Sequence, residues 1–174
     1  MSAVSEIIRQ PLTGEALGQR YRELCASAIF AKLPGKIELD TWGRILMSPA
    51  SNYHGIIQGR LAQRLLVLSG QAMVETSVLT SIGLLVADVA WASSEFMQGH
   101  RDETPFSQAP ELCIEIASPS NSSKELQDKV EAYLAAGSLE AWVVYTQSRR
   151  IEVFAAEGVR PKSIYEIDLQ SLFD

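Results

Sequence analysis

Cysteine, positive charge and long apolar segments are all scarce in this sequence, and each shortage excludes a class of protein. Its two cysteines, Cys25 and Cys113, have neither metal-site nor redox spacing, so they fit a reducing cytoplasm better than a disulfide scaffold. No apolar run approaches the roughly 20 residues that span a membrane, so we expect no membrane association. Residues 1–10 lack a basic segment followed by an apolar core, which predicts a cytoplasmic protein without a secretory signal.

Lysine and arginine number 15 against 21 aspartate and glutamate residues, which gives a net charge of −6 at pH 7. A chain with this balance does not attract polyanions through its overall charge, so nucleic-acid binding would need a local basic patch. Several arginines could form such a patch or could simply be solvated. They are Arg20, Arg22, Arg60, Arg64, Arg149 and Arg150.

The length of 174 residues suits one domain with a substantial core, and 47% hydrophobic with 21% charged residues is ordinary for a globular protein. There are no internal repeats and no low-complexity linker. We expect an N-terminal helical extension over residues 1–35 and a domain over residues 36–174, joined in a single globular unit.

Apolar residues recur at helical spacing in three segments, which predicts helices over residues 13–33, 52–68 and 121–136. Thr13 and Asn52 are expected to cap the first two helices. Gly70 and Gly137 are expected just beyond the ends of the second and third helices. In the second helix the residues predicted to face the core are Ile56, Ile57, Leu61, Leu65 and Leu68.

Segments with strand character alternate with these helices, and their order suggests a mixed sheet flanked by helices. Between two of the strands, the polar segment 93–110 predicts a mobile loop with a single helical turn near Glu95. The predicted strands are a hairpin over 36–48, then 71–80, 84–91, 111–117, 140–146, 150–155 and 163–167.

Two strands with a nearly continuous apolar character each contain one carboxylate, Asp88 in 84–91 and Glu115 in 111–117. A buried carboxylate is costly unless it is paired or binds a cation. One such acid could be a satisfied core residue, but two on successive strands favour a shared divalent cation. Mg²⁺ takes oxygen ligands and commonly uses one or two carboxylates with water and a substrate phosphate.

A lysine is the expected third member of this set. In the helix over 121–136, Lys129 borders the apolar stripe, whereas Lys124 falls on the opposite face near Asp128. A lysine at the margin of a core usually extends to water. If Lys129 instead reaches the two acids, it can orient an attacking water and stabilise negative charge on a phosphoryl oxygen.

Three stretches in this order resemble the Uma2 family of the PD-(D/E)XK, restriction-endonuclease-like superfamily. They are Val86-Ala-Asp-Val-Ala-Trp91, Pro110-Glu-Leu-Cys-Ile-Glu-Ile-Ala-Ser-Pro-Ser120, and Asp128 to Gly137 with Glu140-Ala-Trp-Val-Val144. The upstream Glu38-Leu-Asp-Thr-Trp-Gly43, Met47-Ser-Pro49 and His54-Gly55 are also similar, so the resemblance extends over residues 36–155.

The resemblance implies an α/β (α+β) fold with a restriction-endonuclease-like core, a mixed central β-sheet flanked by helices. It also implies Mg²⁺ or Mn²⁺ held by Asp88 and Glu115. The superfamily lysine normally lies two residues after the second acid, where this chain has Ala117, but the Uma2-like pattern takes it from the next helix, at Lys129. The family's proline before the first acid is Ala87 here, a departure that concerns strand entry more than chemistry.

Four further residues have weaker claims to the site. Glu38 resembles an outer metal ligand but could be an exposed strand residue, and His54 could contact substrate or be a surface group at a helix start. Ser118 and Ser120 are expected to cap the helix of Lys129 and could also meet a phosphate.

These features predict a metal-dependent endonuclease that hydrolyses phosphodiester bonds, with DNA as the expected partner and a homodimer as the expected assembly. Two alternatives stay open. One is a nuclease-fold binding or regulatory module with little or no turnover, which the acidic charge favours. The other is a metal-dependent hydrolase of a phosphate ester outside nucleic acids, since a fold does not determine a substrate.

Overall fold

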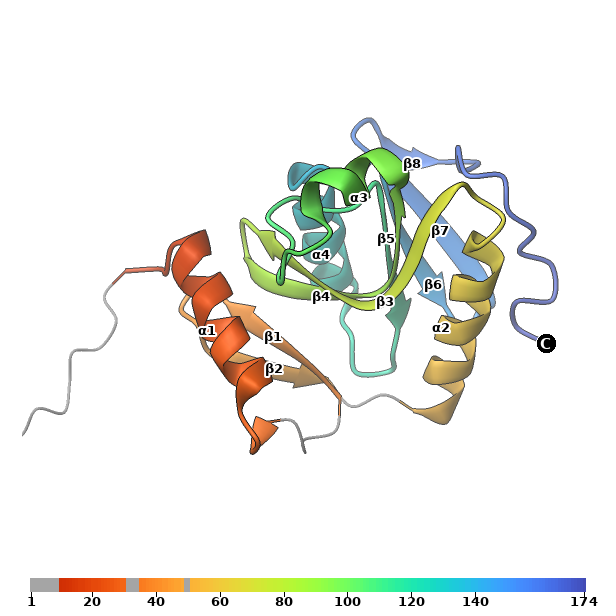
Figure 1. Ribbon diagram of the computed structural model, residues 1–174. Coiled ribbons are helices and arrows are strands. Elements are labelled where there is room, and N and C mark those ends of the chain that lie inside the picture. The colour runs from red at the N-terminus through yellow and green to blue at the C-terminus, as the bar shows by residue number, and fades with distance from the viewer. Residues whose placement is uncertain (1–9, 31–34, 49–50) are drawn as a thin grey trace, which may run out of the picture.

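The computed structural model describes residues 10–30, 35–48 and 51–174, which contain helices on both sides of one curved sheet (Figure 1). The helices are α1 (Gly14–Ala26), α2 (Asn52–Leu65), α3 (Ser94–His100) and α4 (Ser123–Ala135). The strands are β1 (Lys36–Asp40), β2 (Ile45–Ser48), β3 (Gly70–Thr80), β4 (Gly83–Ser93), β5 (Leu112–Ala117), β6 (Glu140–Tyr145), β7 (Arg150–Ala155) and β8 (Gly158–Arg160).

The sheet has the strand order β2-β1-β4-β5-β6-β7-β8, with β3 paired to β4 outside this path. Strands β5 and β6 run parallel, joined by the crossover through α4, while the other pairs are antiparallel. This confirms the predicted mixed sheet flanked by helices. The single parallel pair places α4 directly after β5, which carries Glu115.

Strand β4 has three neighbours, and their arrangement opens a fork in the sheet. β3 pairs with β4 along its whole length. The opposite edge of β4 pairs with β1 at Gly83 and Leu84, and with β5 from Val89 to Trp91. Between these contacts β1 and β5 diverge, so residues 85–88 have no paired strand on that edge among the described elements. Backbone groups in the fork therefore need partners from side chains.

Helix α2 covers one face of the sheet, where Ile57, Leu61 and Leu65 pack with Ile114 and Trp142 in one hydrophobic cluster. Each of these side chains is fully buried. The C-terminal segment packs on the same cluster through Leu172 and runs beside α2 in Figure 1. This face is therefore closed by a helix and by the end of the chain.

Helix α4 covers the other face, where Leu126, Val130 and Tyr133 pack with Cys113 and Val143. Neighbouring residues of β5 and β6 thus enter different clusters, as expected when side chains alternate along a strand. Both faces are buried, which explains why these two strands read as nearly continuous apolar runs.

Helix α1 begins after Thr13, whose side chain accepts a hydrogen bond from the backbone N–H of Ala16, as predicted. It ends at Ala26 rather than at Leu33, and residues 31–34 lie outside the described part of the chain. Ser27 is extended, and its backbone N–H bonds the carbonyl of Leu24, which ends the helix. Through Leu17, α1 packs on Leu39, Leu84 and Val86, so it lies directly on the sheet.

Three predictions about the second helix were wrong. Its cap is Ser51, which accepts a hydrogen bond from His54 N, while Asn52 is the first helical residue. Ile56 is 48% exposed, because α2 meets the sheet through Ile57 and the residues at helical spacing from it. Gly70 is the first residue of β3, where an added Cβ would lie 2.3 Å from Ala92 O.

Two predictions about irregular segments also need correction. The single turn expected near Glu95 is the seven-residue helix α3, and Phe106 in the loop after it exchanges backbone hydrogen bonds with Ser77 and Leu79. No strand forms over residues 163–167, and β8 lies at 158–160 instead. Residues 163–167 are instead held by Glu140, whose side chain accepts hydrogen bonds from Ser163 Oγ and Ile164 N.

Within residues 10–30, 35–48 and 51–174, no helix combines the length and apolar character needed to cross a membrane.

Candidate active site

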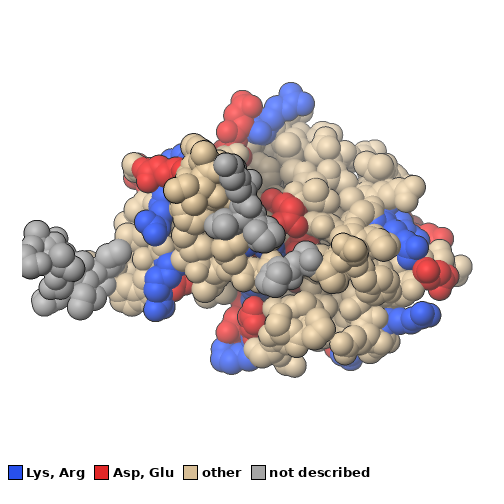
Figure 2. All heavy atoms as spheres, turned by 90° about the horizontal axis from the view of Figure 1, so that it is seen from below, with Lys and Arg blue, Asp and Glu red and all other residues tan. Residues whose placement is uncertain are grey.

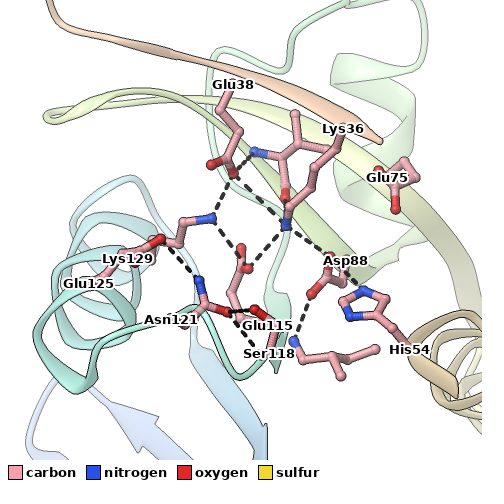
Figure 3. A network of polar contacts seen from close by, with 12 residues as sticks. Lys36, Glu38, His54, Glu75, Asp88, Glu115, Ser118, Asn121, Glu125 and Lys129 are labelled. Atoms are coloured by element: carbon pink, nitrogen blue, oxygen red, sulfur yellow. Dashed lines mark hydrogen bonds and ion pairs between the residues drawn. The ribbon is translucent and has the colours of Figure 1, made fainter. Parts of the chain in front are cut away.

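Five charged side chains from four elements meet in the fork between β1 and β5, where Figure 3 shows them pointing toward one another. Lys36 and Glu38 come from β1, Asp88 from β4, Glu115 from β5 and Lys129 from α4. All of these side chains are less than 10% exposed. The acids and the lysine predicted from the sequence therefore lie together, with Lys36 and Glu38 beside them.

The Asp88 carboxylate uses its two oxygen atoms for different partners. Oδ2 accepts a hydrogen bond of 2.7 Å from the backbone N–H of Ile116, which links β4 to β5 beyond their last ladder pair. Oδ1 lies 2.8 Å from Lys36 Nζ and 3.3 Å from His54 Nε2. One oxygen thus supports the sheet, and the other faces the cations.

Glu115 lies between a tyrosine and two lysines. Its Oε1 accepts a hydrogen bond of 2.7 Å from the hydroxyl of Tyr133, a fully buried residue of α4. Its Oε2 lies 3.2 Å from Lys36 Nζ and 3.4 Å from Lys129 Nζ. Among these three contacts, Oε1 faces the tyrosine hydroxyl and Oε2 faces the two ammonium groups.

Glu38 is buried rather than an exposed strand residue. Its Oε1 accepts hydrogen bonds of 2.9 Å from the backbone N–H of Val86 and 2.8 Å from Lys129 Nζ. The carboxylate therefore replaces a missing strand partner of β4 and also orients the lysine of α4.

The surroundings shift the pKa values of these groups in directions set by burial and charge. Burial disfavours the charged form of Asp88, but the hydrogen bond from His54 and the charge of Lys36 outweigh it and lower its pKa to about 2. Burial raises the pKa of Glu115, against the opposing effect of Lys36 and Lys129. For both lysines the neighbouring carboxylates, Glu115 foremost, outweigh burial and raise the pKa.

The cluster opens into a cavity of about 270 Å³. The five clustered side chains, three acids and two lysines, together carry a formal charge of −1. The hydrogen bond to Asp88 raises the pKa of His54, although burial opposes this. The lining residues are Gly35, Lys36, Ser48, His54, Glu75, Asp88, Glu115, Ile116, Ser118, Asn121 and Lys129.

His54 and Ser118 both border this cavity, whereas Ser120 borders a neighbouring one. The predicted capping role of the two serines was wrong. Ser122 caps α4 by accepting a hydrogen bond from Glu125 N, while the Ser118 hydroxyl bonds Asn121 Oδ1. Several adjacent residues in this turn are capable of capping, and the one that does so depends on where the chain leaves β5.

Lys36 and Tyr133 are two members of the cluster that sequence reasoning missed. Residues two apart on a strand share a face, so a sequence that places Glu38 at the site also places Lys36 on the same side of its strand. Tyr133 was assigned to the apolar stripe of α4, and its hydroxyl is where that stripe reaches the polar cluster. A buried tyrosine hydroxyl usually has a partner, which was the available signal.

The arginines considered as a basic patch are distributed over several elements, and four of them donate hydrogen bonds to backbone carbonyls of this chain. Arg20 donates to Gly43 O, and Arg22 to Thr104 O. Arg60 and Arg64 donate to carbonyls of the C-terminal segment. In Figure 2, which views the molecule from below, the coloured Lys and Arg side chains are scattered toward the margins rather than gathered in one patch.

The oxygen atoms of the acid pair suit a hard divalent cation in type and charge. Among the residues that the structure describes, no group of three or more His, Cys, Asp and Glu side chains is arranged to hold a metal ion. The position between Asp88 Oδ1 and Glu115 Oε2 is taken by a cation of the chain itself, the ammonium of Lys36. Two carboxylate oxygens of a kind that metal ions take thus face one ammonium group in this structure.

Comparisons with known proteins show the family and the fold of the chain. The family described as "Putative restriction endonuclease", Uma2, matches residues 19–171. No protein with a curated description matches the sequence. Among solved structures, the chain is similar to "a putative nuclease belonging to DUF820" from Anabaena variabilis, with 18% identity and a TM-score of 0.60 over 90% of this chain and 84% of that one. The chain thus shares its fold with that protein, and it belongs to the Uma2 family.

Proposed function

We propose that the protein is a metal-dependent nuclease that hydrolyses phosphodiester bonds in DNA. The observation that carries this proposal is the meeting of Asp88, Glu115 and Lys129 at one cavity, although they come from β4, β5 and α4. Buried acids beside a buried lysine are costly to assemble, which favours a functional reason for them.

In this proposal Asp88 and Glu115 would hold Mg²⁺ or Mn²⁺. Such an ion, when bound, polarises a phosphate and lowers the pKa of a coordinated water. Asp88 keeps its other oxygen on Ile116 N, so the carboxylate is oriented whether or not Oδ1 has a cation. Tyr133 orients Glu115 in the same way from the opposite side.

Lys129 supplies positive charge near the scissile phosphate. Its ammonium, 2.8 Å from Glu38 and 3.4 Å from Glu115, is oriented by two carboxylates on either side. The neighbouring acids raise its pKa, so Lys129 stays protonated at neutral pH and acts by charge and hydrogen bonding rather than as a base. It can orient the attacking water and stabilise the charge that develops on phosphoryl oxygens.

One observation favours a binding module without turnover as a second candidate. Lys36 offsets one of the two negative charges of the acid pair. Glu38, Lys36 and Asp88 also provide hydrogen-bond partners for backbone groups of Val86 and Ile116. A cluster with these contacts can persist for structural reasons alone. The hydrolysis of a phosphate ester outside nucleic acids is the third candidate, because the described arginines form no patch around the cavity.

A substrate panel separates these candidates. Supercoiled plasmid, single-stranded DNA, RNA and bis(p-nitrophenyl) phosphate are incubated with the protein and Mg²⁺, Mn²⁺ or EDTA. The proposal expects metal-dependent plasmid nicking that falls at least about a hundredfold in Lys129→Met, the scale of a transition-state donor. Lys124→Met is the matched control, since Lys124 lies exposed on the same helix and pairs with Asp128. Cleavage of the small ester alone would favour the third candidate, and no cleavage with any metal would favour the second.

A further inference from the structure

The ammonium of Lys36 has the surroundings of a bound cation. Its Nζ lies 2.8 Å from Asp88 Oδ1, 3.2 Å from Glu115 Oε2 and 2.8 Å from the backbone carbonyl of Val86. A lysine ammonium has three N–H donors, and three oxygen atoms receive them here. The side chain is 9% exposed, so these contacts take the place of hydration.

The three oxygen atoms around Lys36 are of the kind that hard divalent ions bind, two from carboxylates and one from a backbone carbonyl. Lys129 differs in this respect. It contacts Glu38 and Glu115, but no contact joins it to Asp88. Of the two buried lysines, therefore, only Lys36 bridges both members of the acid pair.

We propose that Lys36 is a built-in competitor for the metal of the acid pair, so that a divalent ion binds there only when the Lys36 side chain withdraws. The inference rests on the metal site of the proposed function. It follows from two physical facts: an ammonium and a metal ion cannot share the space between the two oxygens, and like charges at such a distance repel strongly in a poorly solvated site.

A second cavity beside the site could receive the withdrawn Lys36 side chain. Lys36 borders a second cavity of about 340 Å³ as well as that of the site, and Glu75 borders both. Withdrawal toward Glu75 would keep the ammonium close to a carboxylate and open the position between Asp88 and Glu115. Lys36 is the first residue of β1 and follows Gly35, so its backbone lies at the end of the β1–β2 ladder, where it pairs with Ser48.

Titration of the purified protein with MnCl₂ by calorimetry tests this inference without requiring turnover. We expect Lys36→Met to bind Mn²⁺ at least about tenfold more tightly than the wild type, because one competing charge has left the binding position. Lys129→Met is the matched control, since it removes an equally buried charge that does not bridge the acid pair. The gain in Mn²⁺ affinity should be clearly smaller in Lys129→Met than in Lys36→Met. Equal tightening in both variants, unchanged affinity in Lys36→Met, or no binding in any of the three proteins would overturn the inference.

A second measurement uses the wild type and so does not depend on the folding of a variant. Amine acetylation followed by mass spectrometry reports the accessibility of each lysine. We expect labelling of Lys36 to increase several-fold on addition of Mn²⁺ while labelling of Lys129 stays unchanged. Metal binding without a change at Lys36 would refute the inference. Metal-dependent exposure of Lys36 in a protein that cleaves no DNA would refute only the proposed nuclease function.

Discussion

In Asp88 and in Glu115, one carboxylate oxygen accepts a hydrogen bond that orients the side chain, and the other oxygen contacts the Lys36 ammonium. The fixed contacts are a backbone N–H of β5 for Asp88 and the Tyr133 hydroxyl for Glu115. A carboxylate bound in this way can exchange an ammonium for a metal ion without losing its orientation. That property separates these acids from Glu38, whose Oε1 accepts both of its close hydrogen bonds.

The Tyr133 hydroxyl can be tested alone. Tyr133→Phe removes the hydrogen bond to Glu115 Oε1 and preserves the fully buried ring. Hydrogen bonds to charged groups contribute about 1.5–3 kcal/mol, so we expect the free energy of unfolding to fall by about that amount. Urea denaturation at neutral pH measures it. A variant as stable as the wild type would mean that Glu115 does not depend on Tyr133.

His54 makes stability depend on pH through Asp88. The hydrogen bond to Asp88 raises the pKa of His54 above 6.5, although burial opposes this. A raised native pKa means that protonated His54 stabilises the fold fully below the unfolded value and that this contribution is lost as the pH rises through the native value. The unfolding free energy of the wild type should therefore decline, relative to His54→Gln, as the pH rises above 6.5.

Urea denaturation of both proteins across this range measures the difference. If the stability of the wild type relative to His54→Gln stayed constant, or increased with pH, protonated His54 would not be paired with Asp88.

At the scale of elements, the site depends on how β1 docks on β4. This contact consists of the pairs Leu39 with Leu84 and Asp40 with Gly83, and it sets where Lys36 and Glu38 enter the fork. Gly83 has φ of 130° and lies so close to β1 that an added Cβ would be 2.1 Å from Leu39 O. Only glycine fits this approach.

Gly83→Ala should therefore destabilise the protein by about 2 kcal/mol or more and weaken the docking of β1. Gly59→Ala is the control, since an added Cβ in the middle of α2 meets nothing within 4 Å and alanine favours a helix by about 1 kcal/mol. Thermal unfolding followed by circular dichroism compares the two. Similar melting temperatures for both variants would contradict the close approach of β1 to Gly83.

The C-terminal segment depends on one buried acid of β6. Glu140 is fully buried and accepts hydrogen bonds from Trp142 Nε1, Arg160 Nη1, Ser163 Oγ and Ile164 N. Glu140→Ala should lower the unfolding free energy by about 2 kcal/mol or more, because several donors lose their acceptor.

Limited proteolysis should also cut residues 161–174 of this variant faster. Glu166→Ala is the control, since Glu166 is exposed and its pair with Lys162 should contribute no more than about 1 kcal/mol. Equal stability and equal cleavage in both variants would show that Glu140 does not bind the segment.

For the molecule as a whole, the sequence predicted the residues whose chemistry conflicts with their surroundings. Asp88 and Glu115 stood out because carboxylates are rare in buried strands, and Lys129 because of helical spacing on α4. The three side chains lie in one cluster, and their roles there stay predictions. Membership of the Uma2 family and the mixed sheet were predicted from the same stretches and are confirmed.

What the sequence did not predict depends on long-range geometry. Lys36 begins a short strand, and it enters the site only because β1 and β5 diverge on the same edge of β4. The predicted start of α2 was wrong because the adjacent residues Ser51 and Asn52 are equally able to cap a helix. Ile56 was wrongly predicted to face the core because α2 packs through a narrower stripe than its apolar composition suggested.

The most direct test of the proposed function is plasmid nicking by the wild type beside Asp88→Asn and Glu115→Gln, with Mg²⁺, Mn²⁺ or EDTA. These substitutions preserve shape and remove one ligand charge each, and circular dichroism verifies that both variants fold. The proposed mechanism predicts nicking that requires the metal and falls at least about a hundredfold in both variants. Nicking that persists in EDTA, or in either folded variant, would contradict a metal site built on this acid pair.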